Sequence, residues 1–449
     1  HVLLRSRDAL MNHIQQAPHL YSNYRKVIAL ANQDWENAEL GKVAGLNVEV
    51  MGSNHLLDQY GRELQHFCTT SYLGLDHHPA LLQGAIAALQ ETGTLRVANS
   101  KNRCKLGILE KYETELSQLF DAVCLTTLSC SAASAGILPL LASGVLTENR
   151  PPVMVFDRQA HYSMNHLKAA CADETRVMTC PHNDMNCLEQ ICQQYGRVAY
   201  IGDGAYSMGG VSNMEGLLYL KDRYGLFLYL DDSHALSAVG HNGVGLIRPR
   251  IQTLEDDCVI VASLAKSFGA SGGLVMLGNQ RQKKIIQRYG GPSNWSQSLN
   301  CAAIGAGRAS IRLHYTAEFA ALQARLQANI RLFDSLISTE QCHSAMAIRL
   351  IDCGQADLAN LIASEQVPAP DALVLLDGFF PNVQSNQTLA KQVAQATMPT
   401  LDLYQEEGGR WPLLAAEARR SESRRSHKLN YRPYALMELD ETPTRIQGW

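Results

Sequence analysis

A single lysine follows one of the most apolar stretches of the sequence. The stretch reads VIVASLAKSFGASGG over residues 259–273, and small residues surround Lys266 on both sides. A lysine beside a Val/Ile run is commonly a surface residue whose ammonium group reaches back to water. At the end of a buried strand, its amine can instead form a Schiff base with an aldehyde cofactor. Other residues of the chain that could act together with Lys266 decide between these interpretations.

Three other apolar runs end in residues that suit the second interpretation. LFLYLDDSH places Asp231 after an apolar run and His234 three residues later. A buried carboxylate at such a position is unfavourable unless a cationic group pairs with it. His161 follows the apolar segment VMVFD and a short polar turn. SCSAAS, at 129–134, joins an expected strand to an expected helix, where backbone N–H groups can bind an anion.

Each of these features alone also has an ordinary structural explanation, as a loop cap or a turn without a ligand. Together they match the needs of pyridoxal 5′-phosphate: an amine for the aldehyde, an acidic partner for the pyridine nitrogen, an imidazole against the ring and a turn for the phosphate. Their order along the chain is anion turn, histidine, Asp-x-x-His and lysine.

The elements that must position these residues alternate between strand and helix. Amphipathic helices are expected at 78–92 and 108–120. Short apolar runs predict strands at 123–128, 152–157, 176–180, 198–203, 226–232, 258–264 and 272–277. This alternation predicts a mainly parallel sheet between helices, with ligands beyond the carboxyl ends of the strands.

Composition excludes several other classes of protein. The 449 residues are 46% hydrophobic and 18% charged, as in an ordinary globular protein, and the net charge of −4 gives no basic field for nucleic acid. No apolar run of membrane-spanning length or signal-peptide pattern is present. The 12 cysteines are scattered without a CxxC pair, which favours free thiols in the cytoplasm and no metal site.

The chain divides into three expected parts. Residues 1–60 are expected to form a helical arm and a hairpin, 61–312 a large cofactor-binding domain, and 313–449 a smaller C-terminal domain.

Six segments carry a joint resemblance to one known family. They are SYLGLDHHP (71–79), DRQAHYSMNHLKAA (157–170), HND (182–184), DGAYSMGGVSNMEGL (203–217), LDDSHALSAVGHNGVG (230–245) and SLAKSFGASGG (263–273). The chain resembles the α-oxoamine synthases, a family of fold-type I pyridoxal-phosphate enzymes. The resemblance implies an aspartate aminotransferase-like α/β fold, with a mainly parallel sheet in the large domain and a smaller α+β C-terminal domain.

The resemblance implies a role for each matching residue. Lys266 is the Schiff-base lysine and proton carrier, Asp231 the partner of the pyridinium, and His161 the histidine that stacks on the ring. His234 and Ser207 lie near the cofactor's phenolic oxygen. Further residues are expected to hold the phosphate, namely Cys130, Ser131 and Ser263, and, from a neighbouring subunit, Ser296 or Gln297. The last match implies a homodimer with shared active sites.

The sequence departs from the family pattern where substrates bind. Thr70 stands where an asparagine usually contacts the substrate carboxylate. A glycine-rich loop near the acyl substrate is replaced by a basic one with Arg96, Lys101, Arg103 and Lys105. This loop is either a solvated surface or a binding site for the phosphates of a thioester. The arginine that clamps the substrate carboxylate has no clear match, and Arg432 is the first candidate, followed by Arg349.

The activity implied by the resemblance is a decarboxylating condensation of an amino acid with an acyl thioester, either acyl-coenzyme A or an acyl carrier protein. The departures leave open aminotransfer, decarboxylation or β/γ-elimination on the same fold, and a non-catalytic binding protein.

Overall fold

The computed structural model describes residues 21, 24–40, 42, 44–66, 69–339 and 341–349, and the backbone of 373–376, 400–405 and 431–436. Two compact units are formed, one by residues 1–330 with 344–347 and the other by 331–343 with 348–449. The domain limits expected from the sequence stay predictions.

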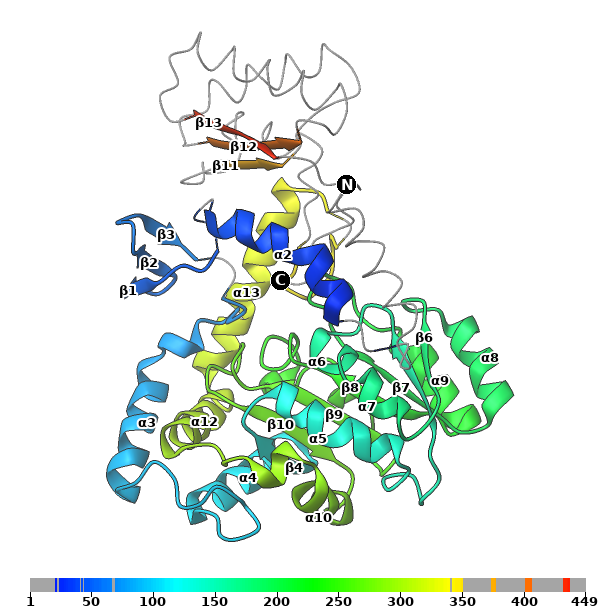
Figure 1. The fold of residues 1–449 in the computed structure, drawn as a ribbon. Coiled ribbons are helices and arrows are strands. Elements are labelled where there is room, and N and C mark those ends of the chain that lie inside the picture. Colours follow the sequence, from blue (N-terminus) through cyan, green and yellow to red (C-terminus); the bar gives the residue numbers. More distant parts are fainter. Residues whose placement is uncertain are drawn as a thin grey trace. The chain divides into compact units, whose positions relative to one another are not determined.

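A seven-stranded sheet forms the centre of the first unit (Figure 1). Its strands are β4 (Val123–Thr127), β5 (Val153–Asp157), β6 (Val177–Cys180), β7 (Val198–Asp203), β8 (Phe227–Asp231), β9 (Cys258–Ser263) and β10 (Gly273–Leu277). The order is β4-β10-β9-β8-β7-β5-β6, and only β10 runs antiparallel to its neighbours. The predicted α/β fold with a mainly parallel sheet is confirmed.

Helices cover both faces of this sheet because its strands are apolar on both sides. In β9, Cys258, Ile260 and Ala262 join one buried cluster, whereas Val259 and Val261 join another. Helices α4 (Gly107–Phe120), α8 (Met185–Tyr195), α9 (Met214–Tyr224) and α12 (Cys301–His314) supply the first cluster. Helices α5 (Cys130–Ala142) and α10 (Gln280–Tyr289) supply the second. Because successive side chains of a strand point to opposite faces, continuous apolar runs suit a sheet covered twice.

The other described elements lie before, between and after those named above. They are α2 (Tyr24–Leu40), β1 (Val48–Gly52), β2 (His55–Asp58), β3 (Glu63–Gln65), η1 (Leu75–His77), α3 (Pro79–Thr92), α6 (Tyr162–Asn165), α7 (Lys168–Ala172), η2 (His241–Gly243), η3 (Arg248–Arg250), α11 (Pro292–Trp295) and α13 (Ala317–Leu336). Strands β1 to β3 form an antiparallel meander. In the second unit, β11 (Leu373–Leu376), β12 (Thr400–Gln405) and β13 (Tyr431–Leu436) form a parallel sheet.

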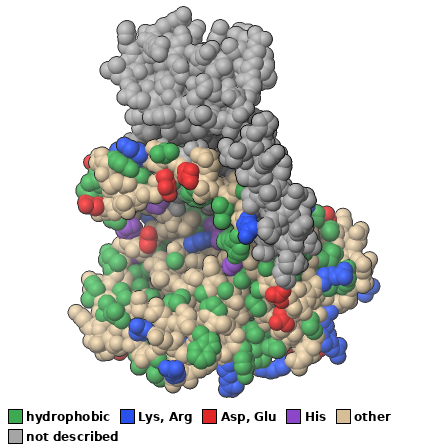
Figure 2. Space-filling view, viewed as in Figure 1, with side chains coloured by type: hydrophobic (Ala, Val, Ile, Leu, Met, Phe, Trp, Pro, Cys, Tyr) green, Lys and Arg blue, Asp and Glu red, His purple; other side chains and the backbone are tan. Residues whose placement is uncertain are grey.

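The described surface carries charges of both signs. On the face shown in Figure 2, acidic and basic side chains are scattered among polar and apolar ones. None of the described helices is both long enough and apolar enough to span a bilayer.

Candidate active site at the carboxyl ends of β8 and β9

Asp231 is the last residue of β8, and its backbone lies beside Asp203 of β7 and Val261 of β9. The side chain is buried, and both oxygens accept hydrogen bonds from neutral donors. The backbone N–H of Ser233 donates to Oδ1 at 2.9 Å, and the thiol of Cys130 donates to Oδ2 at 3.3 Å. These contacts orient the carboxylate without compensating its charge, so a cationic N–H would complete its environment.

Lys266 lies in the loop that follows β9. The N–H of Gly269 donates to the Lys266 carbonyl at 2.9 Å. Gly269 has a φ of +75°, and a Cβ there would lie 2.4 Å from Leu75, so this turn requires glycine. Burial lowers the pKa of Lys266, although the charge of Asp231 acts in the opposite direction. A lowered pKa increases the fraction of free amine, which is the nucleophilic form.

His234 joins the lysine to a tyrosine. Its Nε2 lies 2.7 Å from Lys266 Nζ, and its Nδ1 lies 2.6 Å from the hydroxyl of Tyr72. Burial, followed by the charges of Lys266 and His161, lowers the pKa of His234 to about 3. The imidazole is therefore neutral near pH 7.

One serine joins the loop after β8 to the end of β9. The hydroxyl of Ser233 accepts a hydrogen bond from the N–H of Ser263 at 2.8 Å. Because Ser233 lies between Asp231 and His234 in the chain, this bond helps to hold both in place relative to the segment that carries Lys266.

The expected anion turn lies at the start of α5. The Ser129 hydroxyl caps the helix by accepting from the N–H of Ala132 at 3.1 Å, and Cys130 and Ser131 are the first helical residues. A Cβ on Gly273 would lie 2.5 Å from the Ser129 backbone, so glycine allows β10 to lie close to this turn. The Cys130 thiol contact attaches the turn directly to Asp231.

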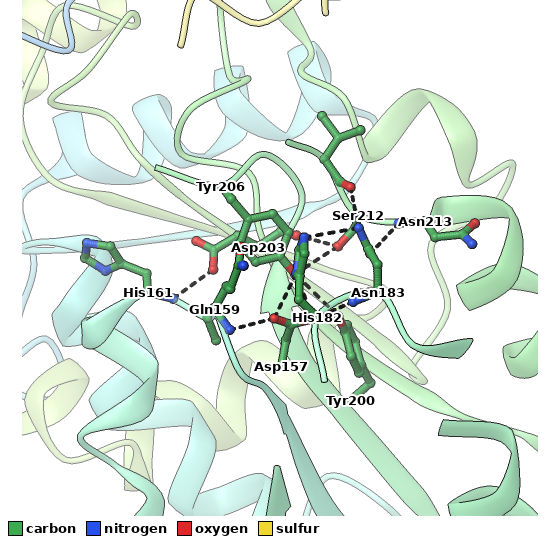
Figure 3. Close-up of polar contacts among 12 residues, drawn as sticks. Asp157, Gln159, His161, His182, Asn183, Tyr200, Asp203, Tyr206, Ser212 and Asn213 are labelled. Carbon is green, nitrogen blue, oxygen red and sulfur yellow. Dashed lines mark hydrogen bonds and ion pairs between the residues drawn. The ribbon is translucent and has the colours of Figure 1, made fainter. Parts of the chain in front are cut away.

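A buried polar network supports the loops beside the site (Figure 3). Asp157 accepts hydrogen bonds from the Gln159 N–H at 2.8 Å and the Tyr200 hydroxyl at 2.9 Å, and its Oδ1 lies 3.1 Å from His182 Nδ1. Asp203 accepts from the backbone N–H of His161 at 2.8 Å. The ring of His161 points away from the rest of this network and is exposed. Its Nδ1 lies 2.9 Å from the hydroxyl of Ser163, which helps to fix the orientation of the ring.

These observations fit pyridoxal phosphate. The site offers an amine with a lowered pKa, a buried carboxylate whose charge is not compensated by its hydrogen-bond donors, and a capped helix N-terminus beside that carboxylate. The cofactor would supply an aldehyde, a protonated pyridine nitrogen and a phosphate to these three groups.

Several predicted contacts fall outside this cluster. Ser207 lies in the turn closed by the Ala205–Val211 bridge, and Ser296 and Gln297 follow α11. Their roles stay predictions. Arg432 is on β13, whose side chains lie outside the described structure.

Arg349 is already engaged by another carboxylate. Its Nε and Nη2 atoms lie 2.6 and 2.7 Å from the two oxygens of Asp334. The guanidinium group that would bind a substrate carboxylate therefore already binds the carboxylate of Asp334.

The basic loop is not wholly a solvated surface. The Lys101 side chain is buried, donates to the carbonyl of Thr126, and lies 3.9 Å from Glu113. Lys105 pairs with Glu110, and Arg96 bonds Asn99, both at the surface. The first interpretation of this loop, a solvated surface, is therefore wrong for Lys101, because the buried Glu113 requires a cationic partner. The second interpretation, binding of a thioester's phosphates, stays a prediction.

Comparison with known proteins agrees with this geometry. A family model described as aminotransferase class I and II matches residues 63–348. The chain belongs to this family. The 8-amino-7-oxononanoate synthase of Geobacter sulfurreducens is 30% identical over 281 residues, covering 61% of this chain and 68% of that protein. The serine palmitoyltransferase of Bacteriovorax stolpii is 27% identical over 212 residues, covering 46% of this chain and 49% of that one.

Solved structures in this family share the fold. The Sphingomonas wittichii serine palmitoyltransferase superimposes with a TM-score of 0.59 at 16% identity, covering 70% of this chain and 81% of that one. The named relatives are α-oxoamine synthases, so the predicted family is confirmed. A second family model, described as a protein of unknown function (DUF3530), matches residues 313–448.

Three contacts were not predicted from the sequence. These are the hydroxyl of Tyr72 on His234, the thiol of Cys130 on Asp231, and the placement of Asp203 beside Asp231. The motif SYLG and the strand end VAYIGD contained two of these residues, but nothing in a single sequence shows that they reach the site.

Proposed function

We propose that the protein is a pyridoxal phosphate-dependent acyltransferase. It joins an amino acid to the acyl group of a thioester and forms an α-aminoketone. The net reaction consumes one amino acid, one thioester and one proton, and yields the aminoketone, CO2 and the free thiol. The observation that carries this proposal is the convergence of Lys266, His234 and Asp231 in a chain related to 8-amino-7-oxononanoate synthase and serine palmitoyltransferase.

Each group has a distinct task in this reaction. When bound, the cofactor supplies an electron sink for the substrate α-carbon. Lys266 holds the cofactor aldehyde between turnovers and, as a free amine, receives the α-proton of the amino acid. Asp231 keeps a proton on the pyridine nitrogen, because its buried carboxylate stabilises positive charge there. His161 covers the ring, and its loop is held by the bond from its backbone N–H to Asp203.

The turn at Cys130 and Ser131 binds the phosphate with backbone N–H groups at the start of α5. Ser263 and Ser207 add hydroxyl contacts in this proposal. Thr70 and Arg432 are the proposed contacts to the substrate carboxylate.

The proposed assembly is a cytoplasmic homodimer in which the segment around Ser296 and Gln297 reaches the phosphate of the neighbouring subunit. This segment is partly exposed, and Trp295 beside it is 75% exposed, which supports a partner surface there. Light scattering on the purified protein tests the assembly, and a monomer at micromolar concentration would contradict it.

The reaction is tested by incubating the cofactor-loaded protein with amino acids and acyl-coenzyme A or acyl carrier protein. We expect free thiol and CO2 in a one-to-one ratio, only when both substrates are present. Formation of a 2-oxo acid without thiol would instead identify an aminotransferase, and CO2 without thiol would identify a decarboxylase. The matched control is Lys266→Ala, which should release neither product.

A further inference from the structure

Tyr72, His234 and Lys266 form a continuous chain of polar contacts. The Tyr72 hydroxyl lies 2.6 Å from His234 Nδ1, and His234 Nε2 lies 2.7 Å from Lys266 Nζ. The expected roles account for the lysine as the Schiff-base residue and for the histidine as a contact to the cofactor's phenolic oxygen. They leave the tyrosine hydroxyl unexplained, although it makes one of the shortest polar contacts in the site.

The backbone that delivers Tyr72 is strained. Thr70 and Tyr72 have φ values of 54° and 42°, in the left-handed region that β-branched and bulky residues rarely adopt. Two local bonds hold this turn: the N–H of Ser71 donates to Thr69 Oγ1 at 3.1 Å, and the Ser71 hydroxyl donates to Asp76 at 2.5 Å. Strain of this kind persists where the surrounding structure requires the conformation, and it is common at functional sites.

Apolar contacts also fix the ring of Tyr72. It packs against a buried cluster that contains Ala205, Ala235 and Ala238. Its ring centroid lies 6.1 Å from that of His234 at an interplanar angle of 50°. This tilted arrangement allows the hydroxyl to approach the edge of the imidazole.

The direction of the hydrogen bond follows from the protonation states. Burial raises the pKa of Tyr72, so its hydroxyl keeps its proton. The lowered pKa of His234 leaves the imidazole with a single proton near neutral pH. A phenolic hydroxyl is a better donor than acceptor, because its oxygen lone pairs are delocalised into the ring. The favoured arrangement has Tyr72 donating to Nδ1 and the imidazole proton on Nε2.

We propose that Tyr72 is a positioning residue: by donating to His234 Nδ1 it fixes the imidazole proton on Nε2, where that proton faces the Lys266 amine. The amine then accepts this hydrogen bond and is stabilised in its uncharged form. This inference rests on the proposed function, since an uncharged amine is what the cofactor aldehyde and the substrate α-proton require.

Other titratable groups lie near the lysine. They are Asp231 on β8, Asp203 on β7, Cys130 on α5 and His161 before α6. The Asp231 carboxylate favours the ammonium form of Lys266, so a hydrogen-bond donor on Nε2 opposes its effect. Without the Tyr72 hydroxyl, the imidazole can carry its proton on Nδ1 instead. Its Nε2 then accepts a hydrogen bond from the ammonium group of Lys266.

The tautomer is measured directly on the apo protein with ¹⁵N-labelled histidine, using His234→Gln to assign the resonances. We expect His234 to show an unprotonated Nδ1 and a protonated Nε2. In Tyr72→Phe, the Nδ1 resonance should move toward the protonated value. A protonated Nδ1 in the wild type, or an unchanged His234 in Tyr72→Phe, would overturn the inference.

The consequence for Lys266 is measured from the rate at which the apo protein forms an imine with pyridoxal phosphate at different pH values. Tyr72→Phe should move the inflection of this rate profile to a higher pH, by about one pH unit. At pH values below the inflection, imine formation should then be about tenfold slower than in the wild type. Tyr219→Phe, an exposed tyrosine on α9, is the matched control and should follow the wild type.

Superimposable profiles for Tyr72→Phe and the wild type would contradict the inference while leaving the proposed function intact. If the wild type forms no imine at all, the proposed function fails, and the nitrogen resonances of the apo protein still decide the role of Tyr72.

Discussion

Asp203 and Asp231 lie opposite each other in register on the parallel strands β7 and β8, and both are buried. Burial, followed by the negative charge of Asp231, raises the pKa of Asp203 well above its usual range. Two neighbouring buried carboxylates therefore have different tasks. Asp203 keeps its proton and supports the loop of His161, whereas Asp231 is the partner proposed for the pyridine nitrogen.

This division predicts different effects of the same substitution. Asp203→Asn keeps a hydrogen-bond acceptor for the His161 N–H and should change the rate of thiol release by no more than about threefold, since about 0.7 kcal/mol corresponds to that factor. Asp231→Asn removes the charge that holds the pyridine proton and should lower the rate on the order of 100-fold or more. Equal losses in the two variants would contradict the assignment.

Asp203 also predicts a dependence of stability on pH. Because its pKa is raised in the folded state, the folded protein keeps a proton that the unfolded chain releases above the ordinary value of 3.8. The stability of the wild type is therefore reduced as the pH rises from 3.8 toward the raised pKa of Asp203. Asp203→Asn removes this cost. The melting temperature of the variant minus that of the wild type should therefore be larger at pH 7 than at pH 4. A difference that is constant with pH would exclude a retained proton.

His314 predicts a dependence on pH of the opposite sign. Its Nδ1 lies 2.7 Å from the carbonyl of Ser310 and its Nε2 lies 2.9 Å from the Ser237 hydroxyl, while its ring stacks on Phe319 at 4.0 Å. Burial lowers the pKa of His314 from 6.5 to about 4. The stability that depends on its neutral form is complete above pH 6.5 and is lost as the pH falls toward 4.

The expected loss over this interval is about 3 kcal/mol, which urea unfolding at several pH values can measure. His314→Gln should have a flatter profile between these pH values, together with a lower stability at pH 7. A variant profile parallel to that of the wild type would show that His314 is not the residue that titrates.

A buried ion cluster predicts a large structural effect away from the chemistry. Glu113 accepts from the N–H of Thr126 at 3.0 Å and lies 2.7 Å from Lys283, with Lys101 at 3.9 Å. Glu113→Gln leaves two buried cations without their carboxylate and should cost about 3–5 kcal/mol. The control is Glu110→Gln, which breaks an exposed pair with Lys105 and should cost at most about 1 kcal/mol. Urea unfolding distinguishes them, and similar costs would contradict the burial argument.

The sheet and much of the site could be predicted from the sequence because they depend on local patterns. Short apolar runs predicted all seven strands, and residues at or just after the ends of β8 and β9 lie at the carboxyl edge of the sheet. Lys266, His234 and Asp231 were predicted for this reason, and the structure brings them together.

The contacts that were not predicted join segments far apart in the chain. Tyr72 and His234 are 162 positions apart, and Cys130 and Asp231 are 101 apart. The burial of Lys101 depends on Glu113 of α4 and on the backbone carbonyl of Thr126 in β4. Such pairings follow from packing and not from periodicity, so one sequence without relatives contains no signal for them.

The covalent attachment of the cofactor is the most direct test of the central claim. The protein is incubated with pyridoxal phosphate, reduced with borohydride and digested, and the modified peptide is located by mass spectrometry. We expect the added mass on Lys266 alone, with visible absorbance before reduction that is absent from Lys266→Ala. An adduct on a different lysine, or none, would contradict the account.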